Sequence, residues 1–386
     1  MVRPTHAVVD LDDLKTNFIA IGRHLAGHQQ AATPRIIAVV KANAYGHGSV
    51  PIALALERAA ASGSETSLIL ACADIEEGVE LRQAGVAVPI LVFGALSVSD
   101  LEGIFDYRLT PTVSSPSAAE ALDRAATLRG LRVGVHLKID TGMNRFGFRF
   151  DNLSETLPKV TSSSHIVLES VYTHFATAEQ ENEPLFAIQQ ERFERIRSDA
   201  PGLNIEGVWW HAANSAALIR DRSVWYDAVR PGLLLYGVLP PPLETPLGTE
   251  LRPVMSLHTR VVAVKGIRRG ESSGYGARFR ANRPMRIAVI PAGYADGMDL
   301  RLGGRGSVLI RGRRAPIVTV SMDSTTIDVT ENTAQPGDEV VVLGEQGGEC
   351  IDVREIAASV GTVPHEILCR IGSRIERTYN RKTMNE

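Results

Sequence analysis

Ile36-Ile37-Ala38-Val39-Val40 is an unbroken apolar run, and Lys41 follows it directly. Runs with apolar side chains on both faces are typical of parallel strands that helices cover from either side. Seven further runs follow, separated by longer stretches rich in Ala, Leu, Glu and Arg: residues 67–71, 89–93, 108–113, 133–137, 166–171, 205–209 and 228–236. This alternation predicts the α/β class, with an N-terminal (β/α)8 TIM-type barrel; an open doubly wound sheet is the main alternative.

The character of the sequence changes at residues 239–246, which contain four prolines. Proline lacks a backbone donor and fixes φ, so this segment cannot continue a helix or a central strand. The short alternating runs beyond it, bounded by Gly, Asp and Asn, are typical of a small antiparallel sheet, with one helix predicted over residues 353–360. We therefore predict two domains: a barrel over residues 1–242 and a C-terminal, mostly-β domain over residues 243–386.

The composition argues against several classes of protein. With 44% hydrophobic and 22% charged residues, the chain has the composition of a globular protein. Its 41 basic and 44 acidic residues leave a net charge of −3, which gives no reason to expect nucleic acid as a partner. The apolar runs are shorter than the roughly 20 residues of a membrane helix, and no signal-peptide pattern is present. We expect a cytoplasmic protein that binds neither nucleic acid nor a membrane.

Polar residues gather where the predicted strands end, which is where an α/β barrel builds its active site. Lys41 ends the first strand, where desolvation would lower its pKa and make the amine a nucleophile toward a carbonyl group. The later strands end in further polar side chains: Lys138, Arg145, His174, His211, Asn214, Ser215 and Arg230. Because burying unpaired polar groups is costly, these residues need a polar, anionic ligand.

Two segments near the seventh and eighth strands predict a phosphate site. Ser215 begins a predicted helix and so combines a hydroxyl with free backbone N–H groups, and Gly232-Leu233 adds more. TIM barrels commonly bind phosphate at this place. A lysine that can form an imine, together with a phosphate site, predicts pyridoxal 5'-phosphate as the cofactor. No spacing of histidines or cysteines predicts a metal site.

Six strings of residues, spread over both predicted domains, resemble those of the alanine racemase family. They are Val39-Val40-Lys41-Ala42-Asn43-Ala44-Tyr45-Gly46-His47-Gly48, Lys138-Ile139-Asp140-Thr141-Gly142-Met143, His211-Ala212-Ala213-Asn214-Ser215, Gly274-Tyr275-Gly276, Ala292-Gly293-Tyr294-Ala295-Asp296-Gly297 and Met322-Asp323. The match runs in order over nearly the whole chain, and the first string alone is highly specific. The resemblance implies a pyridoxal-phosphate-dependent amino-acid racemase that forms a homodimer with shared active sites.

The resemblance also implies a role for each site residue. Lys41 would carry the cofactor and act as the base on one face of the substrate, and Tyr275 of the partner subunit would be the base on the opposite face. The substrate carboxylate would be bound by Arg145 and the backbone N–H of Met322. The implied cofactor contacts are Tyr45, His174, Asn214, Ser215, Arg230, Gly232 and Leu233, and the implied supporting residues are Lys138, His211 and Asp323.

Two of these roles have a physical reason. Inversion at Cα needs a base on each face, because the proton leaves one face and returns to the other. Arg230 would face the pyridine nitrogen of the cofactor, and an arginine is always charged and only donates, so it keeps that nitrogen unprotonated. Lys138 corresponds to a lysine that is often carbamylated in this family and that positions Arg145.

The function implied is interconversion of L- and D-alanine by two bases, which would supply D-alanine for cell-wall peptidoglycan. Three residues depart from the family pattern at the expected substrate entrance: Leu300, Thr319 and Ser373. Because these residues would make the rim of the entrance smaller and less charged, a racemase of broader specificity, which also acts on amino acids such as serine, is an alternative. A barrel-type decarboxylase is a further alternative, although such enzymes generally place a carboxylate where Arg230 stands. A non-catalytic carrier of the cofactor would lack the β domain and Tyr275.

Overall fold

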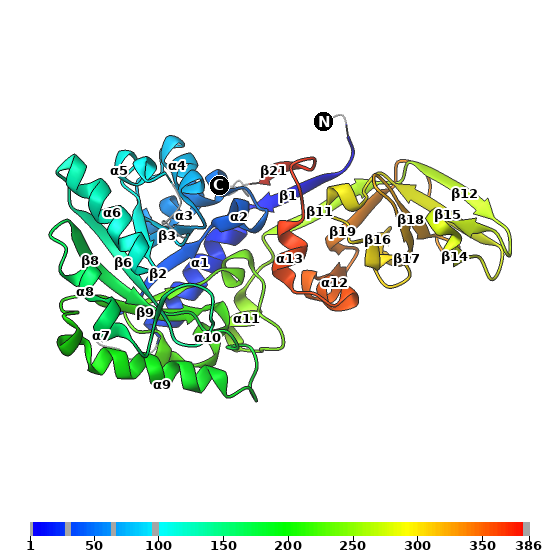
Figure 1. Ribbon diagram of the computed structural model, residues 1–386. Helices are drawn as coiled ribbons and strands as arrows, with labels where there is room; N and C mark the ends of the chain where they lie inside the picture. The colour runs from blue at the N-terminus through cyan, green and yellow to red at the C-terminus, as the bar shows by residue number, and fades with distance from the viewer. Residues whose placement is uncertain (1–2, 28–31, 63–66, 95–99, 381–386) are drawn as a thin grey trace.

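The computed structural model describes residues 3–27, 32–62, 67–94 and 100–380. They form a round α/β region and an elongated β region that extends away from it (Figure 1). One large cluster of buried apolar side chains includes residues of both regions. In these ranges no helix is both long enough and apolar enough to cross a membrane.

Eight parallel strands of the first region form a closed barrel. They are β2 (Arg35–Val39), β3 (Leu68–Cys72), β4 (Ile90–Val92), β5 (Thr110–Val113), β6 (Val133–Asp140), β8 (Ile166–Tyr172), β9 (Trp209–Asn214) and β10 (Ala228–Arg230). Neighbours follow chain order, and the pairs β5–β6 and β10–β2 complete the ring. The predicted (β/α)8 barrel is confirmed, and the open sheet is excluded because its outer strands would have stayed unpaired.

Helices cover the outside of the barrel, and their caps explain where they begin. The side chains of Asp10, Asp74 and Ser115 accept hydrogen bonds from the first N–H groups of three helices, as N-caps do. These helices are α1 (Leu11–Ala26), α4 (Ile75–Gln83) and α6 (Pro116–Arg129). The others are α2 (Lys41–Tyr45), α3 (Ser49–Ala61), α5 (Glu102–Asp106), α7 (Leu153–Thr156), α8 (Pro158–Thr161), α9 (Leu185–Ser198), α10 (Ser215–Arg220) and the 3-10 turns η1 (Ala200–Leu203), η2 (Arg222–Val224) and η3 (Leu233–Tyr236). A short strand, β7 (Phe148–Arg149), pairs with β6.

The second region is built on a ten-stranded sheet. Its strands are β1 (His6–Asp10), β11 (Met255–Arg260), β12 (Ala263–Ile267), β15 (Met285–Ile290), β16 (Ser307–Ile310), β17 (Arg313–Val320), β18 (Thr325–Asp328), β19 (Glu339–Gln346), β20 (Glu349–Ile351) and β21 (Glu376–Asn380). Helix α11 (Pro246–Glu250) leads from the barrel to this sheet and packs against α1. Helices α12 (Val353–Val360) and α13 (Pro364–Cys369) and the turns η4 (Tyr275–Ala277), η5 (Tyr294–Asp296) and η6 (Leu300–Leu302) lie between its strands, and β13 (Ser272–Ser273) and β14 (Phe279–Arg280) form a small hairpin. The predicted mostly-β region is confirmed, with α12 at the predicted residues.

The first strand lies outside the barrel, in contrast to the prediction. A barrel over residues 1–242 would include residues 6–10, but β1 pairs with β11 and β21 of the second sheet. Its side chains alternate between buried and half-buried, as in a strand with one face on a core. The chain therefore starts in the second region, builds the barrel and returns at the proline-rich segment.

Two barrel strands begin or end at other residues than those predicted from the apolar runs. The run at 205–209 starts in a turn, where Asn204 and Gly207 have φ of 55° and 69°. Strand β9 begins only at Trp209 and continues through polar residues, because alternate side chains of a barrel strand point into its interior. The run at 228–236 stops being a strand at Arg230, since Pro231 has no N–H to donate to a neighbour.

Candidate active site

A cavity of about 560 Å³ opens at the carboxyl ends of the barrel strands. Ten of the residues that the sequence predicted for the site line it: Lys41, Tyr45, Lys138, Arg145, His174, Asn214, Ser215, Arg230, Gly232 and Leu233. Four of them are basic, whereas Glu179 is the one acidic residue of the described lining. The surplus of positive charge suits an anionic ligand, as predicted.

Lys41 stands at the start of an unusual turn. Residues 42–45 all have φ between 52° and 54°, a left-handed conformation that costs about 1–3 kcal/mol for each residue other than glycine. Hydrogen bonds hold this turn: the N–H of Ala42 donates to Glu77 Oε1 (2.7 Å), and the N–H of Ser49 donates to Asn43 Oδ1 (2.9 Å). His47 Nδ1 lies 3.0 Å from the carbonyl oxygens of Ala44 and Tyr45. The turn thereby fixes where the Lys41 side chain enters the cavity.

The electrostatic surroundings favour the neutral form of the two lysines. Burial, followed by the charge of Arg145, lowers the pKa of Lys41. Lys138 is 7% exposed, and burial followed by Arg145 and Arg230 lowers its pKa to about 7. Its Nζ lies 5.7 Å from the centres of the Phe146 and Tyr172 rings. Near neutral pH a large fraction of Lys138 is therefore a free amine.

Arg230 is fixed from several sides although it is 3% exposed. Its Nη1 lies 2.7 Å from His211 Nδ1, and its Nη2 donates to the carbonyl oxygens of Thr173 and Ala212, at 2.7 Å each. Nη2 also lies 3.2 Å from His174 Nδ1. Burial lowers the pKa of Arg230 to about 10, and burial followed by the charge of Arg230 holds the pKa of both histidines well below the ordinary value. The guanidinium is thus held by neutral acceptors.

The opposite end of the cavity has the features of an anion cradle. Asn214 caps α10, and Ser215 Oγ accepts hydrogen bonds from the N–H groups of Gly232 (2.9 Å) and Leu234 (3.5 Å). A Cβ atom on Gly232 would lie 2.5 Å from the Tyr45 hydroxyl, so only glycine leaves this space open. Two hydroxyl groups and neighbouring backbone N–H groups match the donors that a phosphate needs.

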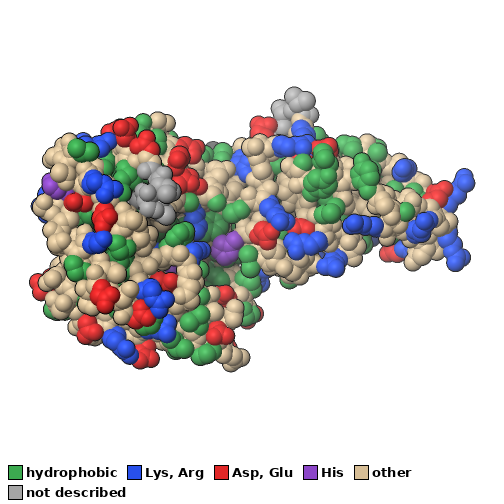
Figure 2. Space-filling view, in the orientation of Figure 1, with side chains coloured by type: hydrophobic (Ala, Val, Ile, Leu, Met, Phe, Trp, Pro, Cys, Tyr) green, Lys and Arg blue, Asp and Glu red, His purple; other side chains and the backbone are tan. Residues whose placement is uncertain are grey.

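Four predicted site residues do not line this cavity: His211, which holds Arg230 from the barrel interior, and three residues of the second region. Tyr275 lies in η4 of the second region and is 87% exposed, while Met322 is 53% exposed and Asp323 is also exposed. None of these three lines the cavity, and the elongated β region extends to one side of the barrel (Figures 1 and 2), although its helix α13 contributes His365 and Cys369 to the cavity lining. Within one chain the two parts of the predicted site are separate.

The turn that carries Met322 is nevertheless held firmly. The N–H groups of Tyr294 and Ala295 donate to the carbonyl oxygens of Ser321 (2.9 Å) and Met322 (3.0 Å). Beneath them Asp296, 1% exposed, pairs with Arg3 (2.6 Å) and Arg374 (3.3 Å).

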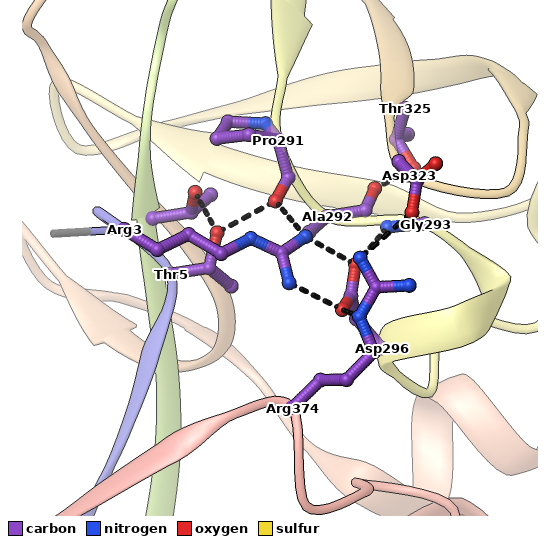
Figure 3. A network of polar contacts seen from close by, with 10 residues as sticks. Arg3, Thr5, Pro291, Ala292, Gly293, Asp296, Asp323, Thr325 and Arg374 are labelled. Atoms are coloured by element: carbon purple, nitrogen blue, oxygen red, sulfur yellow. Dashed lines mark hydrogen bonds and ion pairs between the residues drawn. The ribbon is translucent and has the colours of Figure 1, made fainter.

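Arg374 also donates to Asp323 at 2.7 Å, so one arginine connects the buried carboxylate with the exposed turn (Figure 3). Burial alone would raise the pKa of Asp296, but hydrogen bonds from Arg3 and Gly293 lower it. The residues at the predicted entrance lie in the same region: Leu300 is 51% exposed, Ser373 is exposed, and Thr319 packs against Gly274 beside Tyr275.

Sequence reasoning missed several residues of the site. His136 stands two positions before Lys138 in β6, and this period of two, which puts both side chains on one face of the strand, was a usable signal. Tyr172 stacks on His211 with ring centres 4.6 Å apart. His365, from α13, lies 5.4 Å from the Tyr45 ring, and no local pattern could have predicted this contact across the fold.

The fold and the site define a class of protein: an α/β-barrel enzyme with donors suited to an anionic group beside a desolvated lysine at the carboxyl rim. Comparison with known proteins is more specific. The N-terminal domain of alanine racemases matches residues 9–240, and their C-terminal domain matches residues 254–379. The chain belongs to the alanine racemase family.

Relatives cover almost the full length of the chain. The alanine racemase of Halothermothrix orenii is 40% identical over 384 residues, which cover 99% of this chain and 98% of that protein. That of Symbiobacterium thermophilum is 38% identical, with the same coverage of both chains. The crystal structure of alanine racemase from the D-cycloserine-producing Streptomyces lavendulae has a TM-score of 0.91 at 30% identity, covering 99% of this chain and 98% of that chain.

Proposed function

We propose that this protein interconverts L- and D-alanine with pyridoxal 5'-phosphate, acts as a cytoplasmic homodimer and supplies D-alanine for cell-wall peptidoglycan. The observation that carries the proposal is the cavity at the barrel rim. It combines Lys41, the anion cradle at Ser215 and Gly232, and the buried Arg230 in a chain of the alanine racemase family. We further propose that the boundary between the two domains lies at residues 242 and 243.

The residues of the cavity fit pyridoxal phosphate. Ser215, Tyr45 and the N–H groups of Gly232 and Leu233 would hold its phosphate, and Lys41 would bind its aldehyde carbon. Arg230 would donate to the ring nitrogen, with Asn214 and His174 beside the ring. When bound, this cofactor supplies an electron sink for the negative charge that develops at Cα when its proton is removed.

The protein's own groups then move the proton. Burial lowers the pKa of Lys41 and so favours the neutral amine, which can accept the Cα proton on one face. The partner's Tyr275 would act on the opposite face, and its exposed position in η4 leaves it free to enter a neighbouring cavity. Arg230, which only donates, keeps a ring nitrogen that faces it unprotonated.

Substrate binding uses the remaining groups. Arg145 from the barrel and the backbone N–H of Met322 of the partner subunit would hold the substrate carboxylate, with Asp323 of the partner subunit supporting that turn. Lys138 would support Arg145 in this role, as the resemblance implies.

Racemisation assays with the purified protein test the proposal directly. We expect that L-alanine and D-alanine are each converted to the same equal mixture of the two enantiomers. The purified protein should also show visible absorbance from the bound cofactor, and this absorbance should disappear in Lys41→Ala. Parallel assays with L-serine, L-lysine and L-arginine show whether the small entrance residues Leu300, Thr319 and Ser373 admit larger substrates. Undetectable turnover of alanine would refute the assignment.

The two-base mechanism has its own test. Tyr275→Phe should abolish exchange of the Cα proton with solvent for one enantiomer far more than for the other, because each base serves one face. Proton exchange of L- and D-alanine in deuterated water measures both rates. Equal losses for the two enantiomers would contradict the assignment of Tyr275 as one of the bases.

A further inference from the structure

A column of polar side chains crosses the interior of the barrel, which in this fold is usually filled by apolar layers. His136 Nδ1 lies 3.3 Å from His211 Nε2, and His211 Nδ1 lies 2.7 Å from Arg230 Nη1. The three side chains are 2%, 0% and 3% exposed. His136 also lines a cavity of about 270 Å³ at the amino end of the strands, beside Arg35 and Glu169. The column therefore connects the two ends of the barrel.

Arg230 determines the protonation of each ring in this column. A guanidinium has only donors, so His211 Nδ1 must accept and carries no proton. The neutral His211 ring then has its proton on Nε2 and donates it to His136 Nδ1, which must also be unprotonated. The proton of His136 is consequently on its Nε2. One arginine thus selects one tautomer for both histidines.

Two further observations support this assignment. Burial, followed by the charge of Arg230, lowers the pKa of His136 to about 3, so the ring is neutral at physiological pH. His211 is packed between the rings of Tyr172, at 4.6 Å and 9°, and Trp209, at 5.1 Å and 29°. Stacked in this way, His211 cannot swing out to find another acceptor for its Nε2 proton.

We propose that His136 is a positioning residue for the reaction. It accepts a hydrogen bond from Nε2 of His211 and so holds that ring in place, with its Nδ1 against Arg230. The inference rests on the proposed function for its consequence in catalysis. The arrangement of protons in the column itself does not depend on the reaction.

Two substitutions separate this role from simple packing. His136→Asn places a carboxamide oxygen close to the position of Nδ1 and keeps an acceptor, whereas His136→Leu fills a similar volume without one. We expect kcat for alanine to fall about tenfold in the leucine variant, with KM changed less than about twofold, because Arg230 acts on the cofactor rather than on the substrate. The asparagine variant should stay within about twofold of the wild-type kcat.

A second readout does not use activity. In cofactor-free protein labelled with 15N-histidine, NMR should show His211 unprotonated at Nδ1 and protonated at Nε2 in the wild type and in His136→Asn, whereas in His136→Leu the 15N shift of Nε2 should change because its proton has lost its acceptor. If the leucine variant does not fold, His136→Gln, whose longer side chain cannot place its oxygen at Nδ1, replaces it.

Wild-type kcat together with unchanged 15N shifts in the variant that lacks the acceptor would overturn the proposal, as would a proton on His211 Nδ1 in the wild type. Loss of the proposed function alone gives a different pattern: the wild type would not racemise alanine, while the 15N shifts would still report the predicted tautomers.

Discussion

The two regions of this protein carry their site residues in opposite ways. In the barrel, Arg230 is 3% exposed and is held at 2.7 Å by three separate acceptors. In the second region, Tyr275 is 87% exposed and Met322 is 53% exposed. The barrel therefore offers a preorganised cavity, while the second region presents Tyr275 and Met322 at its surface. This difference is what a site shared between two copies of a chain requires.

Although these side chains are exposed, the backbone that carries Met322 is held in place by buried contacts. The exposed turn with Met322 rests on the buried pair of Asp296 and Arg3, and Arg374 ties that pair to Asp323 (Figure 3). Exposure of the side chain and rigidity of the backbone thus go together.

The largest effect is expected in the barrel, at Lys41. Lys41→Ala removes both the attachment of the cofactor and the base on one face, so kcat/KM for alanine should fall by at least about 10⁴-fold. Lys159→Ala, which removes an exposed lysine paired with Glu120, is the control and should keep wild-type activity. A Lys41→Ala enzyme within tenfold of the wild type would contradict the assigned role.

The next effect is expected in the second region. Asp296→Asn removes the charge that Arg3 and Arg374 share, and the free energy of unfolding should decrease by about 1–3 kcal/mol. The KM for alanine should rise as well, because the Met322 turn loses its support. Asp151→Asn breaks an exposed pair with Arg149 and should leave stability unchanged in the same denaturation experiment. Equal results for the two variants would show that burial of Asp296 is unimportant.

A smaller effect is expected from a single methyl group in the cradle. Gly232→Ala puts a Cβ 2.5 Å from the Tyr45 hydroxyl, and the affinity for pyridoxal phosphate should fall about tenfold. Gly202→Ala has open space around its Cβ and serves as the matched control. Titration of the cofactor-free variants measures both affinities. Unchanged affinity of Gly232→Ala for pyridoxal phosphate would contradict the proposal that this cradle binds the phosphate.

The last prediction concerns pH. The pKa of Lys138 is lowered to about 7 in the folded protein, chiefly by burial, while an unfolded lysine titrates near 10.4. Between these values the unfolded state binds more protons, so Lys138 makes the cofactor-free protein more stable as the pH rises from about 7 to 10. Lys138→Met should flatten this part of the curve of unfolding free energy against pH. A curve parallel to the wild type would contradict the lowered pKa.

Much of the fold could be predicted from the sequence because the barrel strands are continuous apolar runs of one type. The ends of the strands were harder: Trp209 begins a strand that includes His211 and ends at Asn214, and only the closed barrel explains why His211 lies inside. Residues 6–10 could not be placed correctly, since a single apolar strand has no local feature that tells which of two sheets it will join.

The site was predictable where it lies at strand ends, as for Lys41 and Arg230. It was not predictable where distant segments meet, as for His365 beside Tyr45, because such contacts depend on how the two regions pack rather than on a local pattern. His136 is intermediate. Its position two residues before Lys138 indicated the barrel interior, but only its distance to His211 reveals the column.

Complementation between two inactive variants tests most directly whether the halves of the site come from different copies. Lys41→Ala disables the barrel half, and Tyr275→Phe disables the half from the second region. When the two are unfolded together and refolded as an equal mixture, half of the dimers are mixed, and each mixed dimer has one intact site. We expect the refolded mixture to have about one quarter of the wild-type racemase activity, although each variant alone has almost none. A mixture no more active than its parents would contradict the shared site.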